Sequence, residues 1–257
     1  KAIFFCQSDI HEIPELTSIL SAVTPKGLMN RAHAYKAMLE KNALAGNDPD
    51  DGVNMGLYTY PILMAADILL YDSDVVPVGL DQKQHVEIAR DIAENLNRIY
   101  GKTLKLPEGV YAENMKDIPG IDGRKMSKSY NNTLPIFAPE KDLRKQVMRI
   151  VTDSTPPEEP KNPDTCNLFQ IYQNFGTPER VAEIRQLYLQ GGLAYGKLKQ
   201  ELFETMLATF GPARERFEDL MANRTEIDHL LAKGAERARE LAQPVLARVR
   251  KAVGIDR

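Results

Sequence analysis

The chain has 257 residues, which is enough for one large domain or two smaller ones, each with its own core. Hydrophobic residues make up 43% and charged residues 27% of it, a composition typical of a globular chain and not of a disordered one. The net charge of −3 argues against binding nucleic acid through a general positive field, so an RNA partner would need local basic patches. No apolar run is long enough to cross a bilayer, and Cys6 and Cys166 lack the spacing of a metal site. We therefore expect a cytoplasmic protein with no membrane span and no permanent metal.

Taken in chain order, the first half mixes short strands with helices. Apolar runs at 3–6 and 75–78 predict two strands, the first of them buried, although Pro77 makes the second irregular. Pro61 suits the first turn of the helix over 60–71. From Gln82 to Tyr100 apolar residues recur at helical spacing. Strands that alternate with helices favour an α/β domain with a parallel sheet, here over residues 1–135.

Only helices follow the Pro-rich and acidic loop at 152–165. A short helix over 168–175 stops at Gly176, and Thr177-Pro178 is a good N-cap and first-turn pair for the next helix. Two longer helices are expected at about 198–223 and 225–253, and Pro212 and Pro244 should break or kink them. Residues 136–257 are therefore predicted to form a helical domain whose last helix is able to pack back on the first domain.

The most specific short string is Lys125-Met126-Ser127-Lys128-Ser129. Two lysines three residues apart can swing toward one polyphosphate as point charges, and the small serines should keep the loop mobile and add hydroxyl donors. For a generic pair of lysines, a solvated basic loop would be the better interpretation. Here the string is identical to the KMSKS signature of class I aminoacyl-tRNA synthetases, and the chain therefore resembles that class of enzymes.

A second string combines a strand end with polar residues. After Val75–Val78 come Gly79, Leu80, Asp81 and Gln82, and ligands of open α/β sheets bind at such carboxyl ends of strands. Asp81 accepts hydrogen bonds and suits two ribose hydroxyls, whereas Gln82 can both donate and accept. An ordinary helix N-cap is an equally good interpretation of this string taken alone.

The third string places a carboxylate in an apolar helix. Tyr60, Met64 and Asp67 fall at i, i+4 and i+7, on one helix face. A buried carboxylate without partners is costly, so a lone Asp is more often paired with a local donor. The alternative is a donor that a substrate brings. An indole N–H donates and cannot accept, so Asp67 would select for it, with the polarisable sulfur of Met64 beside the ring.

In this order and spacing, the three strings resemble those of bacterial-type tryptophanyl-tRNA synthetases, and the likeness extends through Ala89–Ala93, Val151–Ser154 and Asn167–Tyr172. The resemblance implies a Rossmann-like nucleotide-binding catalytic domain and a helical anticodon-binding domain. It implies ATP-dependent activation of L-tryptophan to tryptophanyl-adenylate, followed by transfer to tRNA(Trp). ATP with Mg²⁺, L-tryptophan and tRNA(Trp) are the implied substrates, and a homodimer is the implied assembly.

The resemblance also implies roles for single residues. Asp67 should accept the indole N–H, and Tyr60 and Gln82 should hold the substrate ammonium. The walls of the indole pocket would be Met64, Val76 and Val78. ATP contacts are implied for Gly79, Leu80, Asp81, Ile118, Lys125, Met126, Ser127, Lys128 and Ser129. Among these, Lys125 and Lys128 should act catalytically by stabilising the β- and γ-phosphates as pyrophosphate leaves.

One departure is the absence of a HIGH-type tetrapeptide, which the family carries near its start. We expect that motif upstream of Lys1, which leaves this chain about half of the ATP site and, by itself, inactive. Two rival hypotheses stay open: a tyrosyl-tRNA synthetase, which usually carries a Q-x-x-D pattern in the recognition helix, and a non-catalytic paralogue that binds tRNA or protein. No base-reading residue is evident, and the arginines of the last helix (Arg237, Arg239, Arg248, Arg250) are expected to be solvated rather than to contact tRNA.

Overall fold

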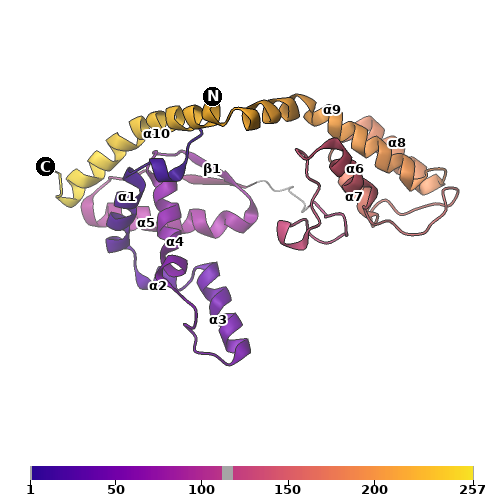
Figure 1. Cartoon of the computed structure of the whole chain (residues 1–257). Helices are drawn as coiled ribbons and strands as arrows, with labels where there is room; N and C mark the ends of the chain where they lie inside the picture. The colour runs from indigo at the N-terminus through magenta and orange to yellow at the C-terminus, as the bar shows by residue number, and fades with distance from the viewer. Residues whose placement is uncertain (1, 112–117, 257) are drawn as a thin grey trace. The chain divides into compact units, whose positions relative to one another are not determined.

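The computed structural model describes residues 2–111 and 118–256, and these fall into two units (Figure 1). The first unit comprises the described residues of Lys1–Met115 and Thr225–Arg257, and the second those of Lys116–Arg224. The sequence predicted a boundary near residue 135, whereas residues 118–135 lie in the second unit. The last helix lies in the first unit, as that prediction allowed. The assignment of the helical region to anticodon binding stays a prediction.

The first unit is an α/β arrangement built on two parallel strands. Its strands pair in the register Val75↔Glu108 through Val78↔Tyr111, and the helix between them makes the crossover that parallel pairing requires. This confirms the parallel, Rossmann-like class. The elements are α1 (Glu12–Val23), α2 (Lys26–Met29), α3 (His33–Ala45), α4 (Met55–Leu69), β1 (Val75–Val78), α5 (Lys83–Tyr100), β2 (Glu108–Tyr111) and α10 (Arg224–Val253).

The core of this unit lies where α1, α4, α5 and α10 meet. Leu16 of α1, Ala65 of α4 and Ile92 of α5 are fully buried, and Ala242 and Val249 of α10 join the same cluster. Small alanines on α4 and α5 allow the helix backbones to approach closely, and α4 and α5 contact each other extensively. The periodicity that predicted α5 is confirmed, since its buried residues recur on one face.

The predicted strand at 3–6 is wrong. This segment has no regular secondary structure, and Phe4 is 79% exposed. Its backbone packs closely against α10 instead of pairing with a strand. The approach is so close that a side chain at Gly234 would collide with the Phe4 carbonyl oxygen. The run is apolar because Phe5 and Ile3 pack on the core of the unit, and not because it belongs to the sheet.

Three prolines lie inside helices, and the structure differs from the prediction at each of them. Pro61 is the seventh residue of α4 and not part of its first turn, because the helix begins earlier, where the Asn54 side chain accepts a hydrogen bond of 2.8 Å from the Leu57 amide. Pro212 and Pro244 lie inside α9 and α10, and neither helix is broken there. Other residues of these helices, such as Met206 of α9 and Ala242 of α10, are fully buried, and their packing offsets the lost hydrogen bond, which costs about 3 kcal/mol.

The second unit is helical apart from its loops. Its N-cap prediction is confirmed, since the Thr177 hydroxyl accepts from the Arg180 amide at 3.3 Å and Pro178 opens the helix that follows. A separate core, with Tyr172 and Tyr188 as its largest fully buried side chains, joins the helices. They are α6 (Glu140–Met148), α7 (Asn167–Tyr172), α8 (Pro178–Gln190) and α9 (Tyr195–Ala222).

Three arginines of α10 form ion pairs within the first unit, while their side chains stay 41–42% exposed, in line with the expected solvated face. Arg239 pairs with Glu12 at 3.2 Å, and Arg250 pairs with Glu15 through two oxygens. Arg248 pairs with Asp72 at 2.5 Å. These contacts join α10 to the rest of the first unit across more than 170 residues of sequence. Within the described part of the chain, no helix is long and apolar enough to span a bilayer, and both cysteines are free.

Candidate functional site

Asp67 lies on α4 with a neutral amide as its hydrogen-bond donor. The Gln7 side chain donates a hydrogen bond of 2.6 Å from Nε2 to Oδ2 of Asp67. Burial raises the pKa of the Asp67 carboxyl, and the bond from Gln7 acts in the opposite direction. Among the described residues Asp67 forms no ion pair, so the local arginine or lysine that a structural role would supply is not there. One carboxylate oxygen, Oδ1, is left to accept from a further donor.

Tyr71 follows Asp67 by one helical turn and has a buried hydroxyl. That hydroxyl has no hydrogen-bond partner among the described residues. Burial, together with the charges of Asp67 and Glu12, raises the pKa of Tyr71 to about 12, so the phenol stays protonated at neutral pH. The ring of Phe5 lies 6.0 Å from the Tyr71 ring, centroid to centroid. The segment that was predicted as a strand thus brings Phe5 and Gln7 to the C-terminal half of α4.

Tyr60 is held by a residue of the next helix. Its hydroxyl and Nε2 of His85 share a hydrogen bond of 3.0 Å, and their rings lie 5.4 Å apart. His85 is buried, and its other ring nitrogen, Nδ1, has no partner among the described residues. Burial lowers the pKa of His85, a nearby His33 acts in the same direction, and Asp81 opposes both. The predicted trio Tyr60, Met64 and Asp67 does lie along one helix, each side chain partly buried.

The end of β1 places the other predicted residues of this unit close together. Val76 and Val78 share the partly buried face of the strand, while Val75 and Pro77 are exposed. The chain then turns through Gly79 into the short helix Leu80–Gln82 and α5.

Asp81 folds back over Gly79, where a Cβ atom would lie 2.6 Å from its Oδ1. Gln82 donates to Oδ2 of Asp81 at 2.9 Å. The side chain of Gln82 makes no capping hydrogen bond at the start of α5, so the N-cap interpretation does not account for it.

The signature loop, residues 118–132, lies in the second unit and forms a small hairpin. The Gly120 amide donates to the Arg124 carbonyl at 2.7 Å, and the Met126 amide donates to the Ile118 carbonyl at 3.2 Å. Lys125 and Lys128 are exposed, as a role toward a polyanion requires. The loop is better braced than its serines suggested, since Ser127 accepts from the Ser129 amide and its own amide is bonded to Asn132.

Met126 and Ile118 differ in their surroundings. Met126 packs against the core of the second unit, and Ile118 is 42% exposed. Nothing in this arrangement tests their predicted contacts with nucleotide, which stay predictions. The loop also carries a strong acid: hydrogen bonds from Asn132 and Arg124 lower the pKa of Asp122 to about 2.

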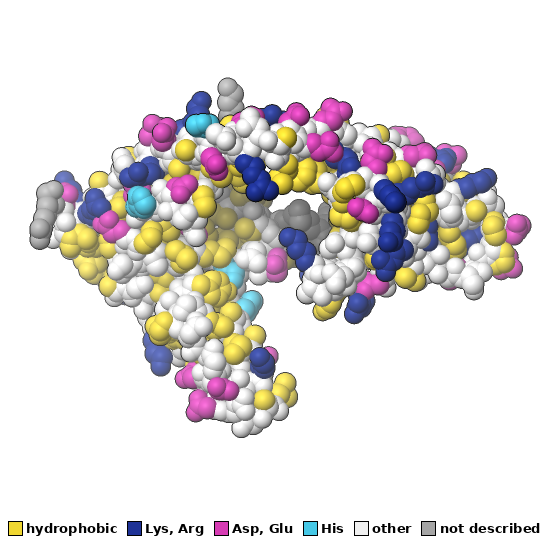
Figure 2. Space-filling model, viewed as in Figure 1, with side chains coloured by type: hydrophobic (Ala, Val, Ile, Leu, Met, Phe, Trp, Pro, Cys, Tyr) yellow, Lys and Arg dark blue, Asp and Glu magenta, His cyan; other side chains and the backbone are white. Residues whose placement is uncertain are grey.

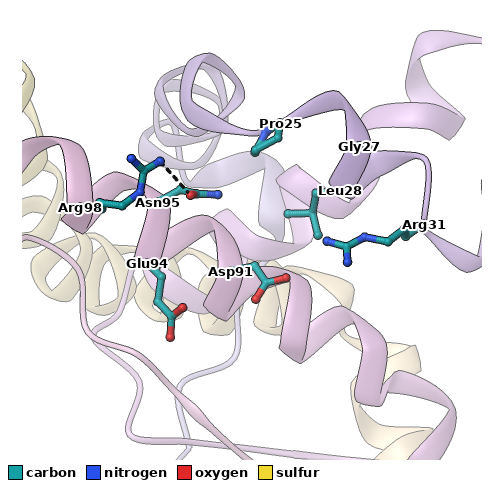
Figure 3. A pocket seen from close by; sticks show the side chains of 8 residues that line it. All are labelled: Pro25, Gly27, Leu28, Arg31, Asp91, Glu94, Asn95 and Arg98. Atoms are coloured by element: carbon teal, nitrogen blue, oxygen red, sulfur yellow. Dashed lines mark hydrogen bonds between the residues drawn. The ribbon is translucent and has the colours of Figure 1, made fainter.

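A separate cavity of about 510 Å³ lies in the first unit between the start of α2 and α5 (Figure 3). Arg31 stands on the segment after α2, and Asp91 and Glu94 stand on α5. No residue of the predicted tryptophan or nucleotide site lines it.

The sequence analysis missed four residues with evident contacts to predicted site residues: Gln7, Tyr71, His85 and Asn132. Gln7 lies 60 positions from Asp67 and His85 lies 25 positions from Tyr60, so no local spacing could reveal the pairs. Tyr71 lies in the predicted helix over 60–71 and His85 in the predicted helix over 82–100, and a polar residue on the apolar face of a helix was the available signal.

Comparisons with known proteins show the family to which the chain belongs. The family model described as tRNA synthetases class I (W and Y) matches residues 1–211. The tryptophan–tRNA ligase of Pseudomonas aeruginosa is 52% identical over 99% of this chain and 57% of its own length. That of Neisseria meningitidis is 49% identical over 99% of this chain and 76% of its own length.

A crystal structure of tryptophanyl-tRNA synthetase from Campylobacter jejuni, complexed with ADP and tryptophan, superposes with a TM-score of 0.85 at 44% identity, covering 98% of this chain and 76% of that one. The chain thus spans little more than half the length of several curated relatives that it matches. On the profile match and on these identities, the chain belongs to the class I tRNA synthetases of the tryptophan and tyrosine group.

Proposed function

We propose that the protein containing this chain is a tryptophan–tRNA ligase, which joins L-tryptophan to tRNA(Trp) at the expense of ATP. The curated relatives at about 50% identity carry that name, and the C. jejuni structure has tryptophan bound. The observation that carries the proposal is the Asp67 carboxylate, partly buried on α4, bonded by the neutral Gln7 and without an ion pair among the described residues. Such a group selects a ligand that can only donate, as the indole N–H does.

The tryptophan-binding residues follow from this placement. Asp67 accepts the indole N–H through Oδ1, and Met64, Val76 and Val78 form apolar walls. Tyr60 and Gln82 accept from the substrate ammonium. The hydrogen bond between Tyr60 and His85 supports that role, because it fixes the Tyr60 oxygen on the side of α4 that faces α5.

The nucleotide residues are proposed on the same basis. Gly79, Leu80 and Asp81 contact ATP, with Asp81 on the ribose, and the backbone at Ile118 meets the adenine. Met126, Ser127 and Ser129 lie along the nucleotide. Lys125 and Lys128 stabilise the β- and γ-phosphates, and Mg²⁺ enters bound to the phosphates of the ATP substrate.

The chemistry proceeds in two steps. The tryptophan carboxylate attacks the α-phosphorus of ATP in line, the bond to the bridging oxygen breaks, and pyrophosphate leaves with its electron pair. A hydroxyl of the 3′-terminal adenosine of tRNA then attacks the activated carbonyl, giving the ester and AMP. Positioning and electrostatic stabilisation carry both steps without a covalent enzyme intermediate. Protein synthesis places this reaction in the cytoplasm, and a homodimer is part of the proposal.

Amino-acid-dependent exchange between pyrophosphate and ATP tests the proposal in the natural full-length protein. Tryptophan should support exchange, and tyrosine should support it about 10³-fold less well or worse. Exchange that is faster with tyrosine would assign the protein to the other branch of the family. No exchange with either amino acid would favour the non-catalytic paralogue.

A further inference from the structure

The buried polar side chain of the signature loop is that of Asn132. It is 1% exposed, whereas Lys125, Lys128 and Ser129 around it are exposed. A buried amide needs partners for its two hydrogens and its oxygen. Those partners show what the residue does in the loop.

The Asn132 amide joins the turn at Asp122 to the arm of the hairpin that follows it. Its Nδ2 donates to the Lys125 carbonyl at 3.0 Å and to Oδ1 of Asp122 at 2.8 Å. Its Oδ1 accepts from the Ser127 amide at 2.8 Å. The backbone groups on either side of Met126 are therefore held by one side chain, and Lys128 follows directly.

The other end of this connection is anchored in the second unit. The Asn132 carbonyl accepts from the Ile121 amide at 2.9 Å. The side chain of Asn167, the first residue of α7, donates to the Gly120 carbonyl at 3.0 Å. Gly120 has no side chain because one would collide with the Asn132 amide. A continuous set of hydrogen bonds thus links α7 to the backbone that carries the two lysines.

We propose that Asn132 is a positioning residue that sets where Lys125 and Lys128 direct their ammonium groups. The inference rests on the proposed function, in which these lysines stabilise the leaving pyrophosphate. Point charges on flexible stems gain from a fixed backbone, because a displacement of about 1 Å in a catalytic group can cost about 100-fold in rate. Asn132 itself touches no substrate.

The test compares Asn132→Asp with Asn131→Asp in the natural full-length protein. Both changes add one negative charge to the same loop, but only the first replaces the two donating hydrogens and sets a carboxylate against Asp122 and the Lys125 carbonyl. Asn131 is exposed and adopts a left-handed φ of 51°, which Asp tolerates. We expect Asn132→Asp to lower the kcat of tryptophan-dependent pyrophosphate exchange by about 10- to 100-fold while tryptophan affinity by calorimetry changes by less than about twofold, with Asn131→Asp near the parent.

A second variant separates positioning from a general loss of structure. Asn132→Ala removes the amide without adding charge, and thermal unfolding identifies any variant that does not fold. In a background that carries both Lys125→Ala and Lys128→Ala, Asn132→Ala should cost much less kcat than in the parent, since Asn132 acts through those two charges. Full additivity of the two losses, or equal losses of tryptophan and ATP binding, would overturn the proposed role.

Binding of a nonhydrolysable ATP analogue distinguishes this inference from the proposed function. If the parent binds the analogue but supports no exchange, the proposed ligase activity fails, and the role of Asn132 is judged by whether Asn132→Asp binds the analogue more weakly than Asn131→Asp. If the parent binds no analogue, the phosphate role of the loop and the inference built on it fail together.

Discussion

The two parts of the candidate site satisfy their polar groups in opposite ways. On α4 and α5, the Tyr71 hydroxyl and Nδ1 of His85 are buried without a described partner, and burial raises the pKa of Asp67. In the signature loop, the amide of Asn132 is fully bonded and the pKa of Asp122 is held at about 2. Polar groups that lack partners suit a ligand that brings its own donors. A backbone held by hydrogen bonds, with exposed lysines, suits an anion that is recognised mainly by its charge.

The surface reflects the same contrast. In Figure 2 apolar side chains are spread over much of the first unit in this view, and Lys and Arg side chains gather in one part of the second unit. Leu80 and Val75 near the end of β1 are more than half exposed. Selection by a shaped, partly apolar surface is therefore expected of the first unit, and attraction of phosphate of the second. Four substitutions test this difference, taken from the largest expected effect to the smallest.

Asp67→Ala should have the largest effect, on discrimination and not on folding. The parent should prefer tryptophan over its benzothiophene analogue, whose ring sulfur replaces the N–H, by about 10³-fold or more, because the analogue leaves the carboxylate unpaired. Asp67→Ala should reduce that preference to about tenfold or less. The ratio of kcat/KM in pyrophosphate exchange measures it, with Asp91→Ala, an exposed acid on α5, as the control. An unchanged preference in Asp67→Ala would remove Asp67 from the indole site.

Lys128→Ala should have the second largest effect, which should be on the rate of adenylate formation and not on tryptophan binding. Loss of one charged group that stabilises the transition state lowers kcat by about 10²-fold, while the dissociation constant for tryptophan stays within about twofold. Rapid-quench measurement of adenylate formation separates the two quantities. Lys141→Ala, which removes an exposed lysine from α6, should leave both unchanged. A defect confined to tryptophan binding would show that Lys128 has been given the wrong role.

Gln7→Ala should have a smaller effect, on tryptophan binding and its pH dependence. The bond from Gln7 lowers the pKa of Asp67, so its loss should move that pKa further upward. Tryptophan needs the ionised carboxylate, so affinity falls as pH drops through the Asp67 pKa, and this fall should begin at higher pH in the variant. At neutral pH we expect affinity to drop by about tenfold at most, the usual scale for one hydrogen bond to a charged group. Calorimetry from pH 5 to 8, with Ser8→Ala as control, would detect it; superimposable curves would contradict the coupling.

The smallest effect concerns His85 and stability. Burial lowers its pKa below the ordinary 6.5, so between the two values the unfolded chain binds more protons than the folded one. Its contribution to stability is therefore complete above pH 6.5 and is lost as pH falls through the folded-state pKa. Urea unfolding should show the free energy of unfolding decreasing from pH 7 to 5, with a shallower decrease in His85→Gln. Equal slopes in the two proteins would mean that His85 binds protons equally in the folded and the unfolded chain.

Much of the architecture was predictable because it depends on short-range patterns. The helical repeat over 82–100 predicted α5 to within a residue of its start, since a single apolar face is enough to place that helix. Thr177-Pro178 predicted the beginning of α8 for a similar local reason. The strand at 3–6 could not be rejected in the same way, because an apolar run pairs in a sheet or packs on a helix depending on what lies beside it. Here the neighbour is Gly234 of α10.

The residues of the candidate site were likewise predictable only where they depend on local sequence. Motif strings identified Asp67, Asp81 and the two lysines, because each string is contiguous and carries its chemistry in its spacing. Pro61 was placed too near the start of its helix, and Pro212 and Pro244 do not break theirs, since a proline costs a helix a fixed amount locally while the packing of residues such as Ala242 and Met206 involves other segments.

The sequence by itself determined the family and the helices with a clear apolar repeat, and it supplied the chemical groups proposed for the site. Only the tertiary structure decided which polar groups meet: Gln7 with Asp67, His85 with Tyr60 and Glu12 with Arg239, a pair separated by 227 positions. Periodicity and motifs record the interactions of neighbours along the chain. A hydrogen bond between distant segments produces no regular spacing in the sequence. It forms only when the packing of the core has brought its donor and acceptor together.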